Sequence, residues 1–304
     1  RNMVATFAYH KPQAGNVRVL LDGGFDTLYT PLVELRRGPG TILLCQLDVT
    51  NRYGSDPVIT RLVGRMLSHY SRPQPPAGKA LRVVGPAKAT ALARRLGFRL
   101  DEADPLQPAR HVVLAQPGAV SPAQARELAA FVRAGGSCLL LGAYQPEGLA
   151  ILRQADVAPP AAQLGTTDNL SLSDAPAVLD GIGPGDFFYR RFMPGVLAQP
   201  DEDGWTGADG LVVVRTLGAG TIVYLAVRPE VFELDSAEDP ADRPAWQQTL
   251  VNWPTSKYYR IVATVLTNLG AASGVRPDLT ATDRSGGLCP LRAVDFDPME
   301  SRTW

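Results

Sequence analysis

One segment of this chain occurs twice, and the repeat constrains the fold more than any other feature. Residues 31–46 read PLVELRRGPGTILLCQ, and residues 211–226 read LVVVRTLGAGTIVYLA. An ungapped alignment pairs Gly38 with Gly218, Gly40 with Gly220, Thr41 with Thr221, and Ile42 with Ile222. Each copy predicts an apolar strand, a turn whose glycines permit positive φ, and a second apolar strand.

The two copies differ in what comes before them. A similar helix follows each one, RLVGRMLSHYS at 61–71 and RIVATVLTNLG at 260–270. About 130 residues of strand and helix sequence precede the second copy, whereas only about thirty precede the first. The chain therefore predicts the C-terminal portion of one α/β domain followed by a complete second one, and hence a piece of a larger protein.

Composition excludes several partners. The chain has 304 residues, of which 45 % are apolar and 20 % charged, as in folded globular proteins. Lys and Arg together number 30, as do Asp and Glu, so no net field attracts nucleic acid. No stretch approaches the roughly 18 uncharged apolar residues of a membrane span. We expect neither a nucleic-acid partner nor a membrane span.

Prolines mark the main domain boundary. The segment SRPQPPAGKA at 71–80 is polar and proline-rich, which is typical of a semi-rigid spacer. We place a first domain portion at 1–72, a linker at 73–80 and a complete domain at 81–270, and we interpret 271–304 as an extended C-terminal tail. A truncated first domain would leave a sheet edge open, so we expect residues 1–70 to pack on the second domain or on another chain.

Strands alternate with helices after the linker. Apolar runs at 81–85, 111–116 and 137–143 predict strands, and the helices between them begin near residue 87 and at Ser121-Pro122, a cap followed by an N1 proline. Helices of this length between strands imply parallel pairing and right-handed crossovers. The fold class is α/β, with a doubly wound sheet.

The sequence does not supply the usual catalytic groups for such a sheet. A nucleophile elbow needs Ser or Cys at a sharp strand-to-helix turn, but the third strand ends in Gly142, Ala143 and Tyr144. Cys138 comes four residues too early and faces the core by alternation. The three histidines are widely spaced, and no glycine cluster matches a nucleotide-binding pattern, so we expect no metal and no cofactor.

One polar loop is the most function-like stretch. Residues 46–52 leave the C-terminal end of a strand, where open α/β sheets place ligand sites. The loop offers four polar side chains for an interface or a ligand, Gln46, Asp48, Asn51 and Arg52. The alternative is that Arg52 pairs with Asp48 or Asp56 and only orders the loop.

The segment YTPLVELRRGPGTILLCQLDVTNRYGSDP and the closing DFDPMESRTW resemble a known family. They are similar to the C-terminal region of large bacterial family 2-type glycoside hydrolases, β-galactosidase-like proteins in which class I glutamine amidotransferase-like modules follow the catalytic part. The resemblance implies a flavodoxin-like fold, a longer parent chain, a secreted or periplasmic location and a non-catalytic role. The amidotransferase cysteine has no counterpart here, so that activity is not implied.

These observations lead to three hypotheses. In the first, the chain is a non-catalytic accessory region of a carbohydrate-active enzyme, and a carboxylate pair outside it hydrolyses the glycoside; its partners are then the rest of the parent chain, a carbohydrate or a second copy. In the second, the chain lines a glycosidase pocket through residues 46–52 or through FFYRRF, where Arg190 and Arg191 bind sugar hydroxyls. In the third, it is an independent small-molecule hydrolase.

Overall fold

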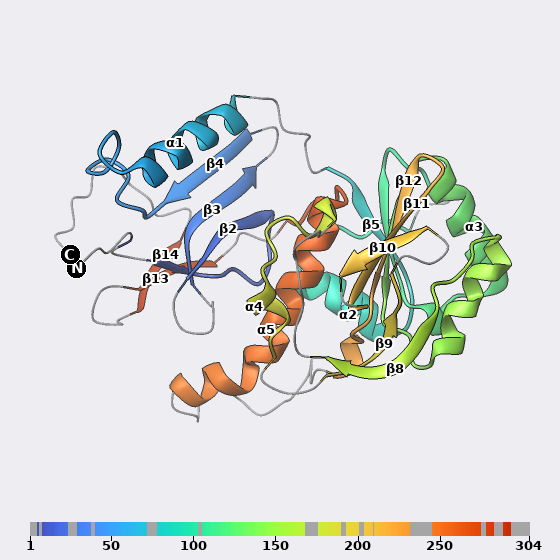
Figure 1. Cartoon of the computed structure of the whole chain (residues 1–304). Coiled ribbons are helices and arrows are strands. Elements are labelled where there is room, and N and C mark those ends of the chain that lie inside the picture. The colour runs from blue at the N-terminus through green and yellow to red at the C-terminus, as the bar shows by residue number, and fades with distance from the viewer. Residues whose placement is uncertain are drawn as a thin grey trace.

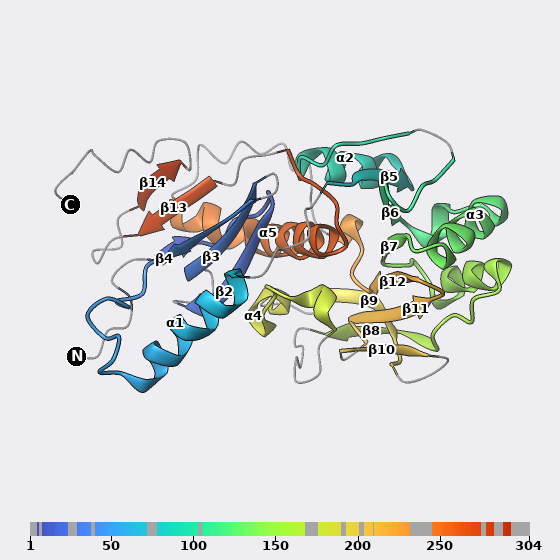
Figure 2. The ribbon, with the colours of Figure 1, turned by 90° about the horizontal axis from the view of Figure 1, so that it is seen from above.

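The structure, a computed structural model, is an α/β protein with two six-stranded sheets (Figures 1 and 2). It describes residues 5, 8–23, 29–37, 40–71, 78–102, 105–167, 176–189, 193–200, 204–208, 210–231, 245–274, 278–282 and 288–292. Helix α5 (Ala245–Asn268) runs between the two sheets in both views.

All the strand pairs described in the first sheet are antiparallel, and the sheet joins both ends of the chain. It contains β1 (Ala8–His10), β2 (Val17–Gly23), β3 (Tyr29–Arg37), β4 (Gly40–Cys45), β13 (Asp278–Thr282) and β14 (Leu288–Arg292). The order is β14-β13-β1-β3-β2, with β4 also paired to β3, and α1 (Pro57–Tyr70) follows β4. The segment interpreted as an extended tail thus supplies a hairpin that pairs with β1, which its weak apolar periodicity does not indicate.

The second sheet is mixed. Its order is β10-β11-β12-β7-β6-β5, formed by β5 (Ala80–Val84), β6 (His111–Ala115), β7 (Ser137–Leu141), β10 (Trp205–Ala208), β11 (Val212–Leu217) and β12 (Gly220–Leu225). Strands β5, β6, β7 and β12 are parallel, and β11 and β10 are antiparallel. Beside it, β8 (Ala162–Thr167) and β9 (Met193–Ala198) form a separate antiparallel pair.

Helices cover both faces of the second sheet. Helix α3 (Pro122–Arg133) contacts β7 and β12 on one face, next to the 3-10 helix η3 (Pro146–Ala155). Helix α2 (Ala87–Arg95) lies with α5 on the other side, where Arg95 stacks on the Tyr259 ring of α5 (Figure 1). The predicted strands and helices between 81 and 143 are confirmed, including the Ser121 cap, which forms a capping box with Gln124.

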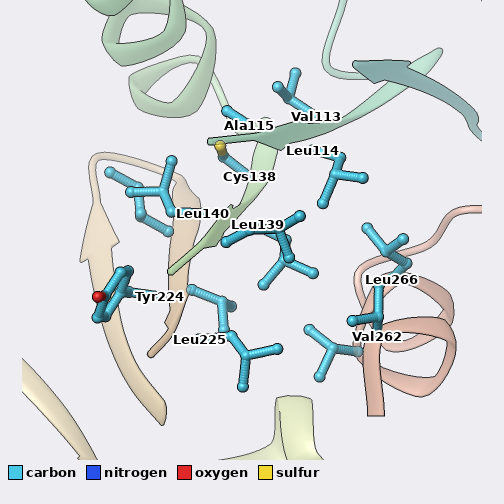
Figure 3. Close-up of a cluster of buried hydrophobic side chains, with 14 of the residues drawn as sticks. Val113, Leu114, Ala115, Cys138, Leu139, Leu140, Tyr224, Leu225, Val262 and Leu266 are labelled. Carbon is cyan, nitrogen blue, oxygen red and sulfur yellow. The ribbon is translucent and has the colours of Figure 1, made fainter. Parts of the chain in front are cut away.

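Alternation along the parallel strands divides the core into two layers. Leu139 and Leu225 point towards Val262 and Leu266 of α5, whereas Cys138 points to the opposite face (Figure 3). On that face, Cys138 and Leu128 of α3 line the same small apolar cavity. All of these side chains are at least nine-tenths buried, so apolar contact on both faces holds the sheet.

The sequence repeat is a repeat of structure. In β3–β4, Leu35 pairs with Ile42 and Arg37 with Gly40; in β11–β12, Arg215 pairs with Ile222 and Leu217 with Gly220. Every residue pair of the first hairpin corresponds to a pair of the second hairpin 180 residues later. The surroundings differ, because β12 also pairs with β7 of the parallel sheet, whereas β4 pairs with β3.

The close packing around the second hairpin predicts that two glycine substitutions, one in β12 and one in α1, have opposite effects on stability. A Cβ on Gly220 would lie 2.1 Å from the carbonyl oxygen of Val132 and 2.2 Å from that of Gly136, both backbone atoms, whereas a Cβ on Gly64 in α1 would meet nothing within 4 Å. We expect Gly220→Ala to destabilise the protein by about 1–3 kcal/mol and Gly64→Ala to stabilise it by about 0.5–1 kcal/mol. Urea unfolding midpoints measure both, and equal shifts would contradict the packing described for Gly220.

Candidate functional site at the carboxyl edge of the parallel sheet

The predicted loop 46–52 forms a local network. The Gln46 amide donates to the Tyr9 phenol, and Asn51 Nδ2 donates to Asp48 Oδ1 at 2.7 Å. The Arg52 guanidinium lies 3.7 Å from the carboxylates of both Asp48 and Asp56.

Asp56 in turn caps α1 through the backbone N–H groups of Val58 and Ile59. The structure therefore joins Asp48, Asn51 and Arg52 in the arrangement of the ordering alternative, before the start of α1, whereas Gln46 bonds to Tyr9 instead. Their binding role stays a prediction. Arg190 and Arg191 lie outside the described residues.

The elbow position follows β7. A Cβ on Gly142 would lie 2.4 Å from the carbonyl oxygen of Ala226, so only glycine fits this close approach of two strand ends. Ala143 is fully buried and Tyr144 is 46 % exposed. Cys138 is buried within β7, and burial raises the pKa of its thiol to about 12. The thiol is therefore protonated at neutral pH and does not serve as a nucleophile.

A polar cluster surrounds Tyr144 at the carboxyl ends of three parallel strands. Gln116 follows β6, Tyr144 follows β7, and Arg228 and Glu230 follow β12. Gln116 is fully buried and donates from Nε2 to Glu230 Oε1 at 3.0 Å. The Arg228 guanidinium carbon lies 4.6 Å from the centre of the Tyr144 ring, within cation–π range.

The electrostatics of the cluster centre on Glu230. Burial, a hydrogen bond with Glu230 and the negative charge of Glu230 together raise the pKa of the Tyr144 phenol. Among the described residues, Gln116 Oε1 and Glu230 Oε2 are buried without a hydrogen-bond partner. The cluster thus holds two unpaired acceptors behind a neutral phenol.

Sequence reasoning missed this cluster as a polar site. It named Tyr144 only as an elbow residue and did not single out Gln116, Arg228 or Glu230. A usable signal exists, because polar residues directly follow neighbouring parallel strands and the carboxyl ends of such strands meet at one edge. The predicted loop, by contrast, leaves β4 of the antiparallel sheet.

A second buried cluster joins the two sheets. Asp186 is fully buried at the end of the short helix α4 (Pro184–Phe187) and accepts from Arg260 of α5 and from Lys11 Nζ at 3.2 Å. Lys11 also pairs with Asp22 of β2 at 2.6 Å. Burial alone would raise the pKa of Asp186, but the charges of Arg260 and Lys11 and a bond from the Gly183 amide outweigh it and lower the pKa.

The described residues contain neither a metal-ligand cluster nor a membrane-spanning helix. Within that part of the chain, no three His, Cys, Asp or Glu side chains gather as they would around a metal ion. None of the helices there combines the length and apolar character that crossing a membrane requires.

No family model matches the sequence, and no curated protein matches it. Among solved structures, the chain is similar to the exo-β-1,4-mannosidase Op5Man5 from Opitutaceae bacterium strain TAV5, with 13 % identity over 69 % of this chain and 39 % of that one, and a TM-score of 0.38. It is also similar to the β-galactosidase from Rahnella sp. R3, with 15 % identity over 75 % of this chain and 38 % of that one, and a TM-score of 0.37.

A third similar structure is the cytoplasmic protein STM1381 from Salmonella typhimurium LT2, with 12 % identity over 63 % of this chain and 99 % of that one, and a TM-score of 0.38. The first two proteins are glycoside hydrolases, and this chain spans about two fifths of their length. TM-scores of 0.37–0.38 do not establish the function of this chain.

Removing the buried carboxylate should destabilise the protein strongly. Asp186→Asn leaves Arg260 buried without its anion, and we expect a loss of about 3–5 kcal/mol in the free energy of unfolding. The matched control is Asp48→Asn, which breaks a partly exposed ion pair with Arg52 and should cost less than about 1 kcal/mol. Chemical unfolding of both variants measures the difference, and a mild effect of Asp186→Asn would show that the cluster is dispensable.

The same carboxylate predicts a pH dependence. Since its pKa is lowered in the folded state, its contribution to stability is present above the unfolded value of about 4 and is lost as pH falls through the folded pKa. The stability difference between the wild type and Asp186→Asn should therefore be largest near neutral pH and should shrink below about pH 4. Unfolding curves recorded between neutral and strongly acidic pH test this, and a difference that grew in acid would contradict the lowered pKa.

Proposed function

We propose that this chain is a non-catalytic accessory region of a carbohydrate-active enzyme, whose glycoside hydrolysis would be carried by two carboxylates outside these residues. The observation that carries the proposal is the elbow of the parallel sheet, where Gly142, Ala143 and Tyr144 stand in place of a serine or cysteine. The nearby thiol of Cys138 is buried and protonated. A scaffold that lacks its nucleophile is suited to binding or docking rather than to covalent catalysis.

The arrangement of the second sheet supports an amidotransferase-like, flavodoxin-like scaffold. Leu100 forms a parallel bridge with Leu81 on the side of β5 opposite β6. The chain therefore passes from β5 through α2 to the outer side of β5 and then returns to β6. The resulting order of parallel segments, 98–100 then β5, β6, β7 and β12, is the doubly wound order of flavodoxin-like folds.

The carbohydrate part of the proposal rests on the sequence resemblance of residues 20–70 and of the closing DFDPMESRTW. In this proposal the partners are the remaining domains of a longer parent chain or a second copy of this one. The contact between β2 and α5 gives an example of such docking, because Arg18 Nη2 donates to Asn268 Oδ1 at 2.9 Å. The division at the linker 73–80 and the secreted or periplasmic location stay predictions.

A second candidate function is that the chain lines part of a glycosidase pocket. The observation that favours it is the gathering of Gln46, Asp48, Asn51 and Arg52 on one loop. Asp48, Asn51 and Arg52 are bonded to one another and Gln46 to Tyr9, so part of their hydrogen-bonding capacity is already used and the accessory role is the better supported of the two.

The accessory role predicts that the isolated chain does not hydrolyse glycosides. Incubation with a panel of nitrophenyl glycosides should release no nitrophenol above the buffer rate, because no carboxylate pair of this chain would act as acid and nucleophile. Turnover that a single substitution abolishes, tested with Asp48→Asn and Glu230→Gln, would overturn the proposal. A full reading frame whose glycosidase activity survives both substitutions would support it.

A further inference from the structure

The carboxyl edge of the parallel sheet has the topology of a ligand site. The crossover after β5 leads outward to residue 100, and the crossover after β6 leads the other way to β7. Open α/β sheets bind their ligands beyond the strand ends at such a switch point. Gln116 lies at this point, since its backbone N–H bonds to the carbonyl of Val84 at the end of β5 at 3.0 Å.

Two acceptors at this point lack donors. Gln116 is fully buried and gives its amide protons to Glu230, while its own Oε1 has no partner among the described residues. The Oε2 atom of Glu230 is likewise buried and has no hydrogen-bond partner among the described residues. A buried acceptor without a donor costs free energy. Two such acceptors, from different strand ends, lie in one cluster, so a ligand that donates hydrogen bonds to both would remove this cost.

Charge and shape narrow the ligand class. Arg228 and Glu230 flank Tyr144 with opposite charges, so the cluster offers no net charge that would favour a simple cation or anion. A hydroxyl group both donates and accepts, so it can serve Gln116 Oε1, Glu230 Oε2 and the Arg228 donors. The half-exposed Tyr144 ring adds an aromatic surface, which suits the apolar face of a sugar ring.

We propose that Gln116, Tyr144, Arg228 and Glu230 form a binding site for a neutral polyhydroxylated small molecule, such as a monosaccharide or a cyclitol. Gln116 and Glu230 accept from its hydroxyls, and the Tyr144 ring packs against its apolar face. The site binds without turnover, because the neighbouring elbow residue is Ala143. This inference goes beyond the accessory role and does not depend on it.

Ligand-observed NMR with glucose, galactose, mannose and myo-inositol tests the site, together with the side-chain amide signal of Gln116. At least one of these probes should bind and shift that signal. Glu230→Gln, which preserves shape, should weaken the affinity about tenfold or more, as expected for a hydrogen bond to a charged group. The control Glu127→Gln, on an exposed position of α3, should leave the affinity unchanged.

Gln116→Met is the second variant and should also weaken the affinity about tenfold or more, which keeps the test decisive if Glu230→Gln does not fold. An affinity that is unchanged in either folded variant would overturn the site. Absence of binding for all four probes would overturn it as well, since the two acceptors would then be served by water alone. Binding of ethylammonium or of alanine in place of the sugars would overturn the ligand class.

Discussion

The buried carboxylate of Asp186 is the interaction on which the arrangement of this protein depends. It is fully buried and is shared by Lys11, which precedes β2, and by Arg260 of α5. Burial of a carboxylate is costly unless cations and hydrogen bonds surround it, so α5 cannot move away without leaving the buried Arg260 unpaired, and withdrawal of the first sheet would remove Lys11, one of the two cations at Asp186. Lys257, one turn earlier on α5, reinforces the position by donating to the carbonyls of Gly185 and Phe188 at 2.7 and 2.6 Å. The charges thus set where α5 lies, and its apolar face then covers the parallel strands.

The position of α5 also determines the geometry of the carboxyl edge. Tyr258, fully buried on α5, donates to the carbonyl of Val227 at 3.4 Å. Val227 immediately precedes Arg228 and lies three residues before Glu230, so α5 holds the segment that carries half of the polar cluster. Gly142 fixes the other side, because its missing side chain lets β7 approach Ala226 closely. Helix α5 therefore connects the interface between the sheets with the candidate site. We expect a substitution of Asp186 to alter the position of Glu230.

Local patterns predicted the α/β class and the elements between 81 and 143, because caps, alternation and helical spacing depend on neighbouring residues. The same holds for the loop at 46–52, where the i, i+4 spacing of Asp48, Arg52 and Asp56 indicated the observed pairs.

Contacts between distant residues could not be predicted in this way. Gln116 and Glu230 are 114 positions apart, and β13 pairs with β1 across nearly the whole chain.

The two hairpins show why a sequence repeat does not imply two equivalent domains. Glu34 in the first copy aligns with Val214 in the second, and the substitution changes how the following helix is held. Glu34 is fully buried and accepts from Tyr70, the last residue of α1, at 2.7 Å and from Arg36 at 2.9 Å. Burial alone would raise the pKa of Glu34, but these two bonds and the nearby Arg18 outweigh burial and lower the pKa. The carboxylate therefore stays charged and binds the helix end.

The second copy has no such charge at the corresponding position. It packs instead against apolar side chains of α5 such as Val262 and Leu266 (Figure 3). The two helices differ in cover as well, because Val58 and Leu67 leave α1 partly exposed whereas α5 runs between the two sheets.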